Sequence, residues 1–497
     1  MSTTTAQRAT SAPGAANAGY RTLWRWHFYA GLFVMPFLVV LAITGTLYCF
    51  QPQIEPLLYP HRLIVEPQAM PRLTEDALLA KARAAMPADA RAVTAPIASA
   101  LERSTEFIFR LADGEKQSVY LSPYSGEVLG TLSVEHRFMQ VDRMLHRKLL
   151  LGKPGELLME LAACWTLVMI GTGIALWWPR EKTTARAALV PRFSLRGRPL
   201  WKNLHVVMGI WLALGALIFV LSGLPWTGSW GKQFKALATA ANLGAPPGSW
   251  GGLPLRSALP GVRADKHAGT ADAGAETQQG HGEHSAHQAN MDSMPGMVMD
   301  DLPLPLTPWA VGNTPVPQSA DAHAAQALPL GHIVDLVASL GVQSGYDIVL
   351  PSSATGVYTV SYFPADPKDE RTLYIDQYSG TVLKDIRYGD YGAVSKAVSY
   401  GTSLHMGRYF GVANQILCAV ISLGLAGMAV TGFVMWWKRR PQRSLGAPSR
   451  ERAAPPMRGW KTGLVLLGIV FPLMGATLLA VWLADRTIFG RATRQPA

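Results

Sequence analysis

Two stretches of the chain share a spacing of histidine, glycine, threonine and tryptophan that constrains the fold more than any other feature. In each, a Leu-His pair is followed by Gly six residues after the histidine, by Thr-Gly at 26 and 27 residues, and by Trp-Trp at 31 and 32. The stretches cover residues 145–178 and 404–437. Each contains a long apolar run, and about 20 apolar residues cross a bilayer. The sequence therefore predicts two membrane helices of one design.

A second pair of segments repeats in the same way. His27 is followed by Gly31 and Gly45, and the other segment has His205, Gly209 and Gly223 at the same offsets of 4 and 18. At 100° per residue both offsets return close to the face of the histidine, so each histidine is expected to have two glycines beneath it. The chain is therefore predicted to be a duplicated unit with a histidine at one end of each of four spans.

Five apolar runs are long enough to cross a membrane, so the expected fold class is a membrane α-helical bundle made of a duplicated two-span unit plus one further span. A tail at 1–20, rich in Ala, Ser and Thr, is predicted to be disordered. The expected spans are 21–50, 156–178, 205–226, 405–437 and 462–484, followed by a tail at 485–497.

The net charge of +12 is concentrated in two short connections, at 179–204 and 438–461. By the positive-inside rule both are cytoplasmic, which places the N-terminus in the cytoplasm and the long connections, 51–155 and 227–404, on the far side. This pattern indicates contact with a lipid bilayer and argues against nucleic-acid binding.

The two long connections resemble each other. Each has a helix-like segment, strand-like segments, and the pattern Tyr-x-x-x-Tyr-Ser-Gly-x-Val-Leu, at 120–129 and 374–383. We expect two small α+β domains. The second connection also contains an insert at about 242–325, rich in Gly, Ala, Pro, His and Met and without the periodicity of a packed element.

Together with the Leu-His pairs and the Trp-Trp exits, these strands resemble the PepSY-associated transmembrane family over about residues 21–440. That family includes iron-regulated inner-membrane proteins and ferric-siderophore reductases. The resemblance implies a multi-pass protein of the bacterial inner membrane, haem b between its helices, and PepSY-like domains facing the periplasm.

Histidine at membrane depth is costly unless it is paired or ligated, and haem iron takes imidazole as an axial ligand. The topology places His27 and His205 at the cytoplasmic end and His146 and His405 at the periplasmic end. Two bis-histidine sites for two haems b are therefore expected. The slots for the porphyrins would come from Gly31, Gly45, Gly209 and Gly223. The alternative is four interfacial histidines that reach the headgroups. His136 is a weaker candidate ligand than His146, since the second repeat has no counterpart of it.

The insert contains a cluster of imidazole and thioether groups, which suit copper ions. Its members are His281, His284, His287, Met291, Met294, Met297 and Met299. A spacer that binds metals only incidentally is the alternative.

The predicted function is a di-haem reductase that passes electrons across the membrane to a periplasmic ferric siderophore or Cu(II). No nucleotide-binding glycine motif follows a strand, so the donor is expected to be separate, either a quinol or a cytoplasmic reductase. The rival hypotheses are a siderophore or metal transporter without enzymatic activity and an accessory PepSY binding module without haem. A transporter should have polar groups along a path at mid-membrane, and these runs have hardly any.

Overall fold

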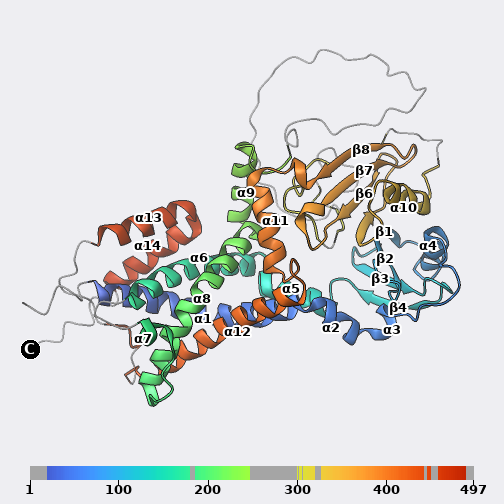
Figure 1. The fold of residues 1–497 in the computed structure, drawn as a ribbon. Coiled ribbons are helices and arrows are strands. Elements are labelled where there is room, and N and C mark those ends of the chain that lie inside the picture. The colour runs from blue at the N-terminus through green and yellow to red at the C-terminus, as the bar shows by residue number, and fades with distance from the viewer. Residues whose placement is uncertain are drawn as a thin grey trace, which may run out of the picture. The chain divides into compact units, whose positions relative to one another are not determined.

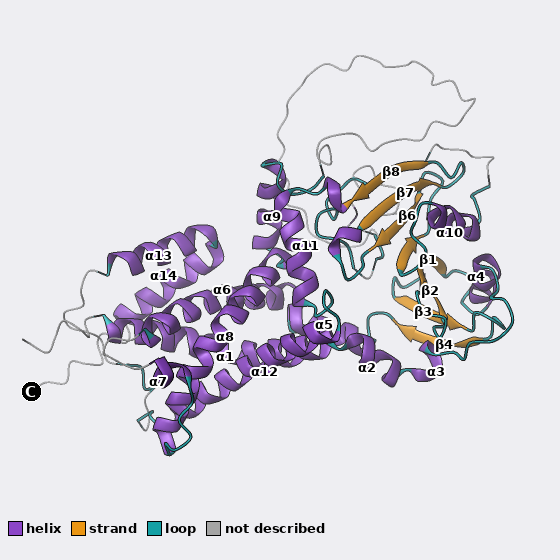
Figure 2. Cartoon of the chain, viewed as in Figure 1, coloured by secondary structure: helices purple, strands orange, loops and turns teal. Residues whose placement is uncertain are grey.

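The computed structural model describes residues 19–178, 185–246, 299, 302–304, 306–319, 326–441, 445–448 and 457–487. The chain divides into two compact units (Figures 1 and 2). The helical unit contains Met1–Ile54, Phe138–Ala236 and Tyr400–Ala497, and the sheet unit contains Glu55–Arg137 and Leu237–Ser399.

Four helices of the helical unit are long and apolar enough to cross a membrane. They are α1 (Tyr20–Cys49), α6 (Gly152–Trp177), α8 (Gly197–Gly223) and α12 (Val412–Trp437). Helix α1 packs against α6 and α12, and α8 packs against the same two helices. Large apolar side chains such as Trp211, Leu214 and Val420 remain exposed on these helices, as expected where a lipid phase covers them.

The run expected to form a fifth span is divided into two helices instead. Helix α13 (Arg458–Val470) ends at Phe471, and α14 (Pro472–Thr487) follows at once. Pro472 lacks the N–H that a continuing helix needs, and its ring restricts the residue before it. At 1.5 Å per residue the two helices are about 20 and 24 Å long, shorter than the ~30 Å hydrocarbon core.

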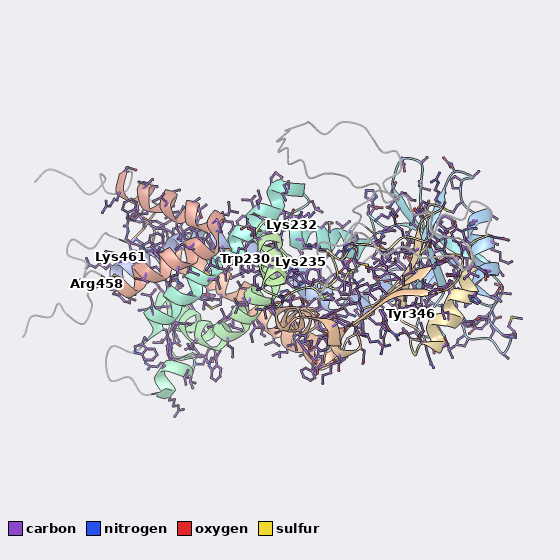
Figure 3. The ribbon with its side chains drawn as sticks, turned by 90° about the horizontal axis from the view of Figure 1, so that it is seen from above. Trp230, Lys232, Lys235, Tyr346, Arg458 and Lys461 are labelled. Carbon is purple, nitrogen blue, oxygen red and sulfur yellow. The ribbon has the colours of Figure 1, made fainter. Side chains whose placement is uncertain are left out.

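The two helices form a hairpin that begins and ends near the start of α1. The Trp460 ring of α13 lies 6.4 Å from the Trp26 ring, and Asp485 of α14 pairs with Arg25. At the other end of the hairpin, the carbonyl of Val470 accepts a hydrogen bond of 2.7 Å from the indole of Trp230. Figure 3 shows Arg458 and Lys461 together at the end of the helical unit away from Trp230.

Two short helices precede α6 and α12, where the sequence predicts that His146 and His405 open the spans. Helix α5 (Phe138–Lys148) and helix α11 (Ala393–His405) each end in a tight turn before the span begins. The turn after α5 has two leucines with positive φ, 52° at Leu149 and 58° at Leu150, whereas the turn after α11 has glycine at both of its positive-φ positions. The remaining helices of the described chain are short. They include α2 (Gln51–Leu58), α3 (Pro60–Leu63), α7 (Ala185–Leu189), the 3₁₀ helix η1 (Leu224–Trp226) and α9 (Trp230–Ala240).

The sheet unit contains one antiparallel sheet of eight strands in the order β4-β3-β2-β1-β5-β6-β7-β8. The strands of the first half are β1 (Arg91–Ile97), β2 (Thr105–Arg110), β3 (Lys116–Leu121) and β4 (Val128–Ser133). Those of the second half are β5 (Tyr346–Val349), β6 (Val357–Tyr362), β7 (Arg371–Asp376) and β8 (Val382–Arg387). The halves join where β1 pairs with β5, from Thr94 opposite Val349 to Ile97 opposite Tyr346.

The expected pair of small α+β domains is therefore a single sheet with one shared core. Phe107 and Leu121 from the first half and Leu373 and Ile375 from the second belong to the same buried cluster. Helices α4 (Glu75–Ala84) and α10 (Leu330–Ser339) contribute to that cluster. In two separate four-stranded sheets, β1 and β5 would both be exposed edge strands, and the β1–β5 pairing covers them, so that only β4 and β8 remain at the edges of the joined sheet.

A side chain from the first half caps the helix of the second. The Asp76 carboxylate accepts the backbone N–H groups of Leu330 (2.8 Å) and Gly331 (3.0 Å). Those groups belong to the first turn of α10 and have no partner within their own helix. An acid at this position also interacts favourably with the helix dipole, so Asp76 holds the two halves together.

Candidate functional site

The four histidines that the sequence singles out form two close pairs. We call His27 of α1 and His205 of α8 the first pair, and His146 of α5 and His405 of α11 the second pair. The ring centroids are 6.3 Å apart in the first pair and 6.5 Å apart in the second. The ring planes are nearly perpendicular in both, at 82° and 87°.

Every one of these imidazoles has its Nδ1 atom beside a hydroxyl group of another helix. In the first pair, His27 lies 2.9 Å from Oγ1 of Thr172, and His205 lies 2.9 Å from Oγ1 of Thr431. The hydroxyls of the second pair are Oγ1 of Thr44, 2.8 Å from His146, and Oγ of Ser222, 2.9 Å from His405.

The hydroxyls determine which ring nitrogen carries the proton. Each one donates its own hydrogen to a carbonyl in the preceding turn of its helix, as Thr172 does to Val168 (2.6 Å) and Ser222 to Ile218 (2.6 Å). A hydroxyl that donates there can only accept from the imidazole, so Nδ1 carries the proton. The Nε2 atom then keeps its lone pair, which is the form in which histidine binds a metal.

A glycine follows each hydroxyl residue and lies against the same histidine. A Cβ atom built on Gly45 would lie 3.2 Å from Cε1 of His146, and one on Gly223 would lie 3.5 Å from Cε1 of His405. For the first pair, the corresponding distances are 3.3 Å from Gly173 to His27 and 3.5 Å from Gly432 to His205. A larger residue at any of these positions would crowd the ring, so a Thr/Ser-Gly dipeptide supports each imidazole.

This arrangement changes the role expected for two of the glycines. The sequence places Gly45 and Gly223 beneath His27 and His205, on the same helix face. Eighteen residues also advance a helix by about 27 Å, so these glycines lie at the far end of their spans and support the second pair. A Cβ atom added to Gly31 would meet no atom within 4 Å, and one added to Gly209 would lie 3.1 Å from Cε of Met428.

The end of α11 is held by side chains around His405. The last carbonyls of a helix have no partner within it. Here the Leu404 carbonyl accepts from Nδ2 of Asn414 (3.0 Å) and from Sγ of Cys418 (3.2 Å). The His405 carbonyl lies 3.7 Å from Sγ of Cys49. These contacts fix the position of the ring at the end of its helix.

Three arginines lie near Tyr48, which follows Thr44 by four residues on α1. Arg143 hydrogen-bonds to the phenol of Tyr48, and Arg147 and Arg408 also lie near that phenol. Arg147 follows His146 directly in the chain and donates to the carbonyl of Trp226 (3.3 Å). These cations make the second pair a favourable place for the carboxylates of a cofactor.

Aromatic residues flank His27 in the sequence of α1. The guanidinium of Arg439 lies over the rings of Trp24 (4.6 Å) and Phe28 (5.5 Å), close in sequence to His27. Trp26 stacks on Trp165 with 6.2 Å between the ring centroids. The residues on either side of His27 in α1, Trp26 and Phe28, therefore pack against other aromatic or cationic side chains.

Among the described residues, no group of three or more His, Cys, Asp or Glu side chains is placed to hold a metal ion. Each histidine pair therefore offers two protein ligands and no third. An imidazole nitrogen lies about 2 Å from a metal that it binds, so two such bonds on opposite sides, with the ring radii added, need centroids roughly 6 Å apart. Both pairs meet that requirement.

The other predicted ligands lie elsewhere. His281, His284, His287, Met291, Met294 and Met297 lie outside the described residues. Met299 is fully buried in the sheet unit, and its sulfur accepts a hydrogen bond of 3.4 Å from the hydroxyl of Tyr374, which is the position of a core residue. His136 also belongs to the sheet unit, where its Nδ1 atom lies 3.1 Å from Oγ of Ser133.

Two acids of the sheet unit, Glu106 and Asp347, lie near each other. Glu106 accepts hydrogen bonds from Arg137 (2.8 Å) and from the phenol of Tyr120 (3.1 Å). Burial, together with the negative charge of Glu106, raises the pKa of Asp347 to about 7. This carboxyl group is therefore partly protonated near neutral pH, unlike an ordinary surface aspartate.

Four apolar helices of spanning length define this chain as a multi-pass membrane protein, and its helical unit contains two pairs of histidines. The family model of the PepSY-associated TM region matches residues 24–439, and the chain belongs to that family. The match covers all four histidines and both halves of the sheet. No curated protein matches the chain.

Proposed function

We propose that the protein is a di-haem b membrane reductase that passes electrons from one face of the bilayer to an acceptor on the other. The observation that supports this most strongly is the geometry of the two histidine pairs. Each consists of two imidazoles whose centroids are 6.3 or 6.5 Å apart, and each imidazole has its Nδ1 proton held by a hydroxyl. Membrane helices rarely contain histidine without a functional reason.

The residues fit an iron porphyrin better than a bare metal ion. A porphyrin supplies four ligands in a plane and leaves two axial positions, which is what two histidines without a third ligand can fill. The glycines after the hydroxyl residues leave the imidazoles uncrowded, and Gly31 leaves open space one turn from His27. Bound haem would supply a one-electron couple, while the chain orients the ligands and adjusts the potential.

The two pairs lie far enough apart to connect the faces of a membrane. Thr44 lies 17 residues after His27 on α1, which corresponds to about 26 Å along the helix axis, close to the ~30 Å hydrocarbon thickness. The basic connections at 179–204 and 438–461 favour a cytoplasmic position for the first pair and a periplasmic one for the second. This orientation suits a bacterial inner membrane.

The acceptor that we propose is a ferric siderophore, since the family resemblance points to iron uptake. Oxygen chelators hold the reduced ion more weakly, so reduction at the second pair would help to release the iron. Cu(II) is the alternative acceptor, for which the His- and Met-rich insert is the reason. In both cases the sheet unit would hold the acceptor.

An absorption spectrum of the purified protein before and after dithionite tests the proposal. We expect two b-type haems per chain, with the sharp Soret and α bands of bis-histidine ligation in the reduced state. Addition of a ferric siderophore to the reduced protein should reoxidise the haem. A colourless preparation would remove the reductase and favour a transporter or an accessory binding module without haem.

A further inference from the structure

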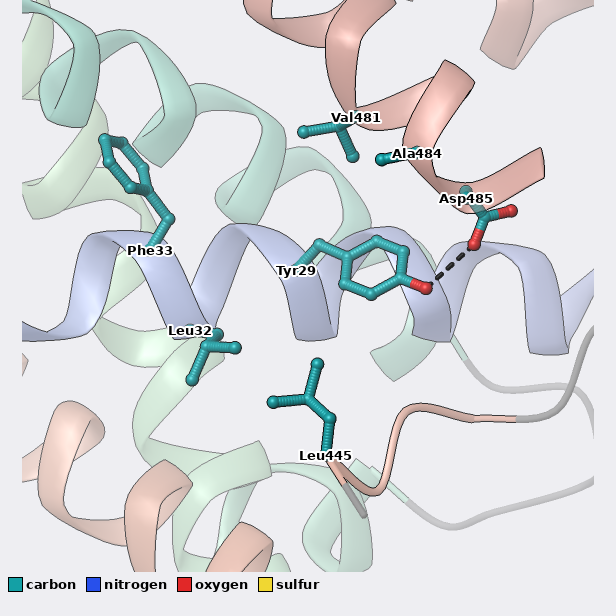
Figure 4. Close-up of a pocket in the computed structure, with 7 residues that line it drawn as sticks. All are labelled: Tyr29, Leu32, Phe33, Leu445, Val481, Ala484 and Asp485. Atoms are coloured by element: carbon teal, nitrogen blue, oxygen red, sulfur yellow. Dashed lines mark hydrogen bonds between the residues drawn. The ribbon is translucent and has the colours of Figure 1, made fainter. Parts of the chain in front are cut away.

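A cavity of about 320 Å³ lies between α1 and α14, and the histidine pairs do not use it. Its lining is Tyr29, Leu32, Phe33, Leu445, Val481, Ala484 and Asp485 (Figure 4). Five of the seven side chains are apolar. The volume is at the lower end of the range for small-molecule sites, which are typically apolar with a few fixed polar groups.

The polar groups of the cavity are gathered in one place. The phenol of Tyr29 donates a hydrogen bond of 2.8 Å to Oδ1 of Asp485, as the dashed line in Figure 4 marks. Arg25 pairs with the same carboxylate and donates to the Tyr29 oxygen (2.7 Å). Away from this group the lining consists of aliphatic and aromatic carbon. A ligand in the cavity would meet hydrogen-bonding groups at one side and hydrocarbon elsewhere.

The cavity lies at the depth of the first pair, on the opposite face of the same helix. Tyr29 is two residues after His27, which moves about 3 Å along α1 and 200° around it. Leu32 and Phe33 follow three and four residues after Tyr29, so they share its face. The cavity and the first pair are therefore separated by about one helix diameter, roughly 10 Å.

We propose that this cavity binds a membrane quinol, which would be the electron donor for a cofactor held by the first pair. The inference rests on the proposed function, and it identifies the chemical class of the electron donor. A quinol has a flat ring with a hydroxyl on either side and an apolar tail, which matches a small apolar cavity with one polar side. The hairpin of α13 and α14 lies beside the spans, where a donor dissolved in the bilayer can reach it.

The reaction balances with groups that the site provides. Oxidation of one quinol to a quinone releases two electrons and two protons. The electrons would pass singly to the one-electron couple that a cofactor held by the first pair would supply. One quinol hydroxyl hydrogen-bonds to the Asp485 carboxylate, which takes up that proton and passes it to water at the end of the bundle where α1 begins. The second hydroxyl loses its proton to water at the same end.

The test is anaerobic reduction of the haem-loaded protein by a short-chain quinol, followed by absorbance. Ala484→Trp should fill the cavity and slow quinol-dependent reduction by about tenfold or more, which corresponds to about 1.4 kcal/mol of lost binding. Leu479→Trp, at an exposed position on the same helix, is the matched control and should reduce at the wild-type rate. Dithionite should reduce all three proteins equally.

Asp485→Asn separates the proton acceptor from the binding site. Asparagine keeps the size and the hydrogen bond from Tyr29 but cannot take up a proton. We expect quinol oxidation to slow in this variant while the binding of a quinone inhibitor is retained. A variant that oxidises quinol at the wild-type rate would show that Asp485 is not the acceptor.

Photolabelling of the unmodified protein with an azidoquinone provides a measurement that does not depend on the folding of a variant. The label should appear in the peptides containing 29–33 and 481–485 and should be displaced by an excess of the unlabelled quinone. A label confined to other helices would show that the quinone binds elsewhere, and it would overturn the inference.

The outcomes also separate this inference from the proposed function. If dithionite reduces the wild-type haem but quinol does not, the donor is of another class and the reductase remains. If quinol reduces the wild-type protein and Ala484→Trp at the same rate, quinol binds outside this cavity. If wild type contains no haem, the proposed function fails.

Discussion

The first and second histidine pairs use the same parts in different settings. In both, imidazoles from one pair of helices meet Thr/Ser-Gly dipeptides from another. The histidines of the first pair lie inside the long helices α1 and α8, so helical turns on both sides of each histidine fix its backbone conformation. Those of the second pair lie at the ends of short helices, α5 and α11, beside turns with positive φ. The second pair therefore depends on turn geometry in a way that the first does not.

Loss of a ligand should have the largest effect, and it should be confined to one pair. His205→Ala should empty the first site and leave one haem per chain, and His405→Ala should do the same for the second site. Haem per protein, measured as the pyridine haemochrome, should fall from two to one in each case, and electron transfer to the acceptor should stop. His136→Ala, in the sheet unit, is the control and should keep both haems. Loss of both haems from one substitution would show that the pairs are not independent.

Bulky replacements of glycine should reveal that α1 serves both pairs. Gly45→Leu should displace His146 and empty the second site while the first stays filled, because its Cβ position lies only 3.2 Å from that ring. Gly31→Leu should affect the first site, since it fills the open space one turn from His27. Gly171→Leu, at an exposed position of α6, should affect neither. Spectra and haem content distinguish the three. If Gly45→Leu empties the first site instead, the assignment of α1 to both pairs is wrong.

Removal of a hydroxyl group should change the midpoint potential of the haem at that site without causing the haem to be lost. Thr44→Val removes the acceptor of the His146 Nδ1 proton, and Thr172→Val does the same for His27. A hydrogen bond of this kind is worth about 0.5–1.5 kcal/mol, which corresponds to roughly 20–60 mV for one electron. The bond makes the imidazole more basic and stabilises ferric iron, so its loss should raise the midpoint potential. A redox titration should show the shift at one haem only, and Thr44→Ser should restore the wild-type value.

Much of this organisation is readable from the sequence, because spacing in a helix determines both face and depth. The repeat brings His27 to His205 and His146 to His405, and the chain forms four of the five expected spans. The sequence repeats identify only some of the Thr/Ser-Gly dipeptides that contact the histidines. Thr172-Gly173 is part of the first repeat, whereas Thr44 and Ser222 are not part of the pattern by which the second repeat was recognised. A signal for them exists nonetheless, since each precedes a glycine 18 residues after a histidine.

Two features of the fold could not be read from local patterns. The run at 462–484 is as apolar as a span, and its proline alone does not predict a break, since Pro36 lies inside the unbroken helix α1 whereas Pro472 begins the new helix α14. The union of the two α+β segments into one sheet depends on β1 and β5, which are 249 residues apart when counted from Ile97 to Tyr346. Strand patterns predict that an edge exists, and they do not predict which strand pairs with it.

The smallest expected effect concerns the two turns that precede α6 and α12. Leu150 has φ 58° without a glycine's freedom, which costs about 1 kcal/mol, so Leu150→Gly should relieve strain and raise the melting temperature by a few degrees at most. Gly411, with φ 58° and ψ −137°, lies in a region that essentially only glycine adopts, so Gly411→Ala should lower it by more. Neither position crowds a neighbour, since Gly411 has no atom within 4 Å of its Cβ position and the Leu150 side chain is exposed. Both changes in melting temperature are measured by thermal unfolding of the haem-loaded protein. A rise for Leu150→Gly and a fall for Gly411→Ala would show that the turn beside His146 is strained and that the turn beside His405 is not. If both substitutions change the melting temperature in the same direction, the turns beside His146 and His405 do not differ in backbone strain.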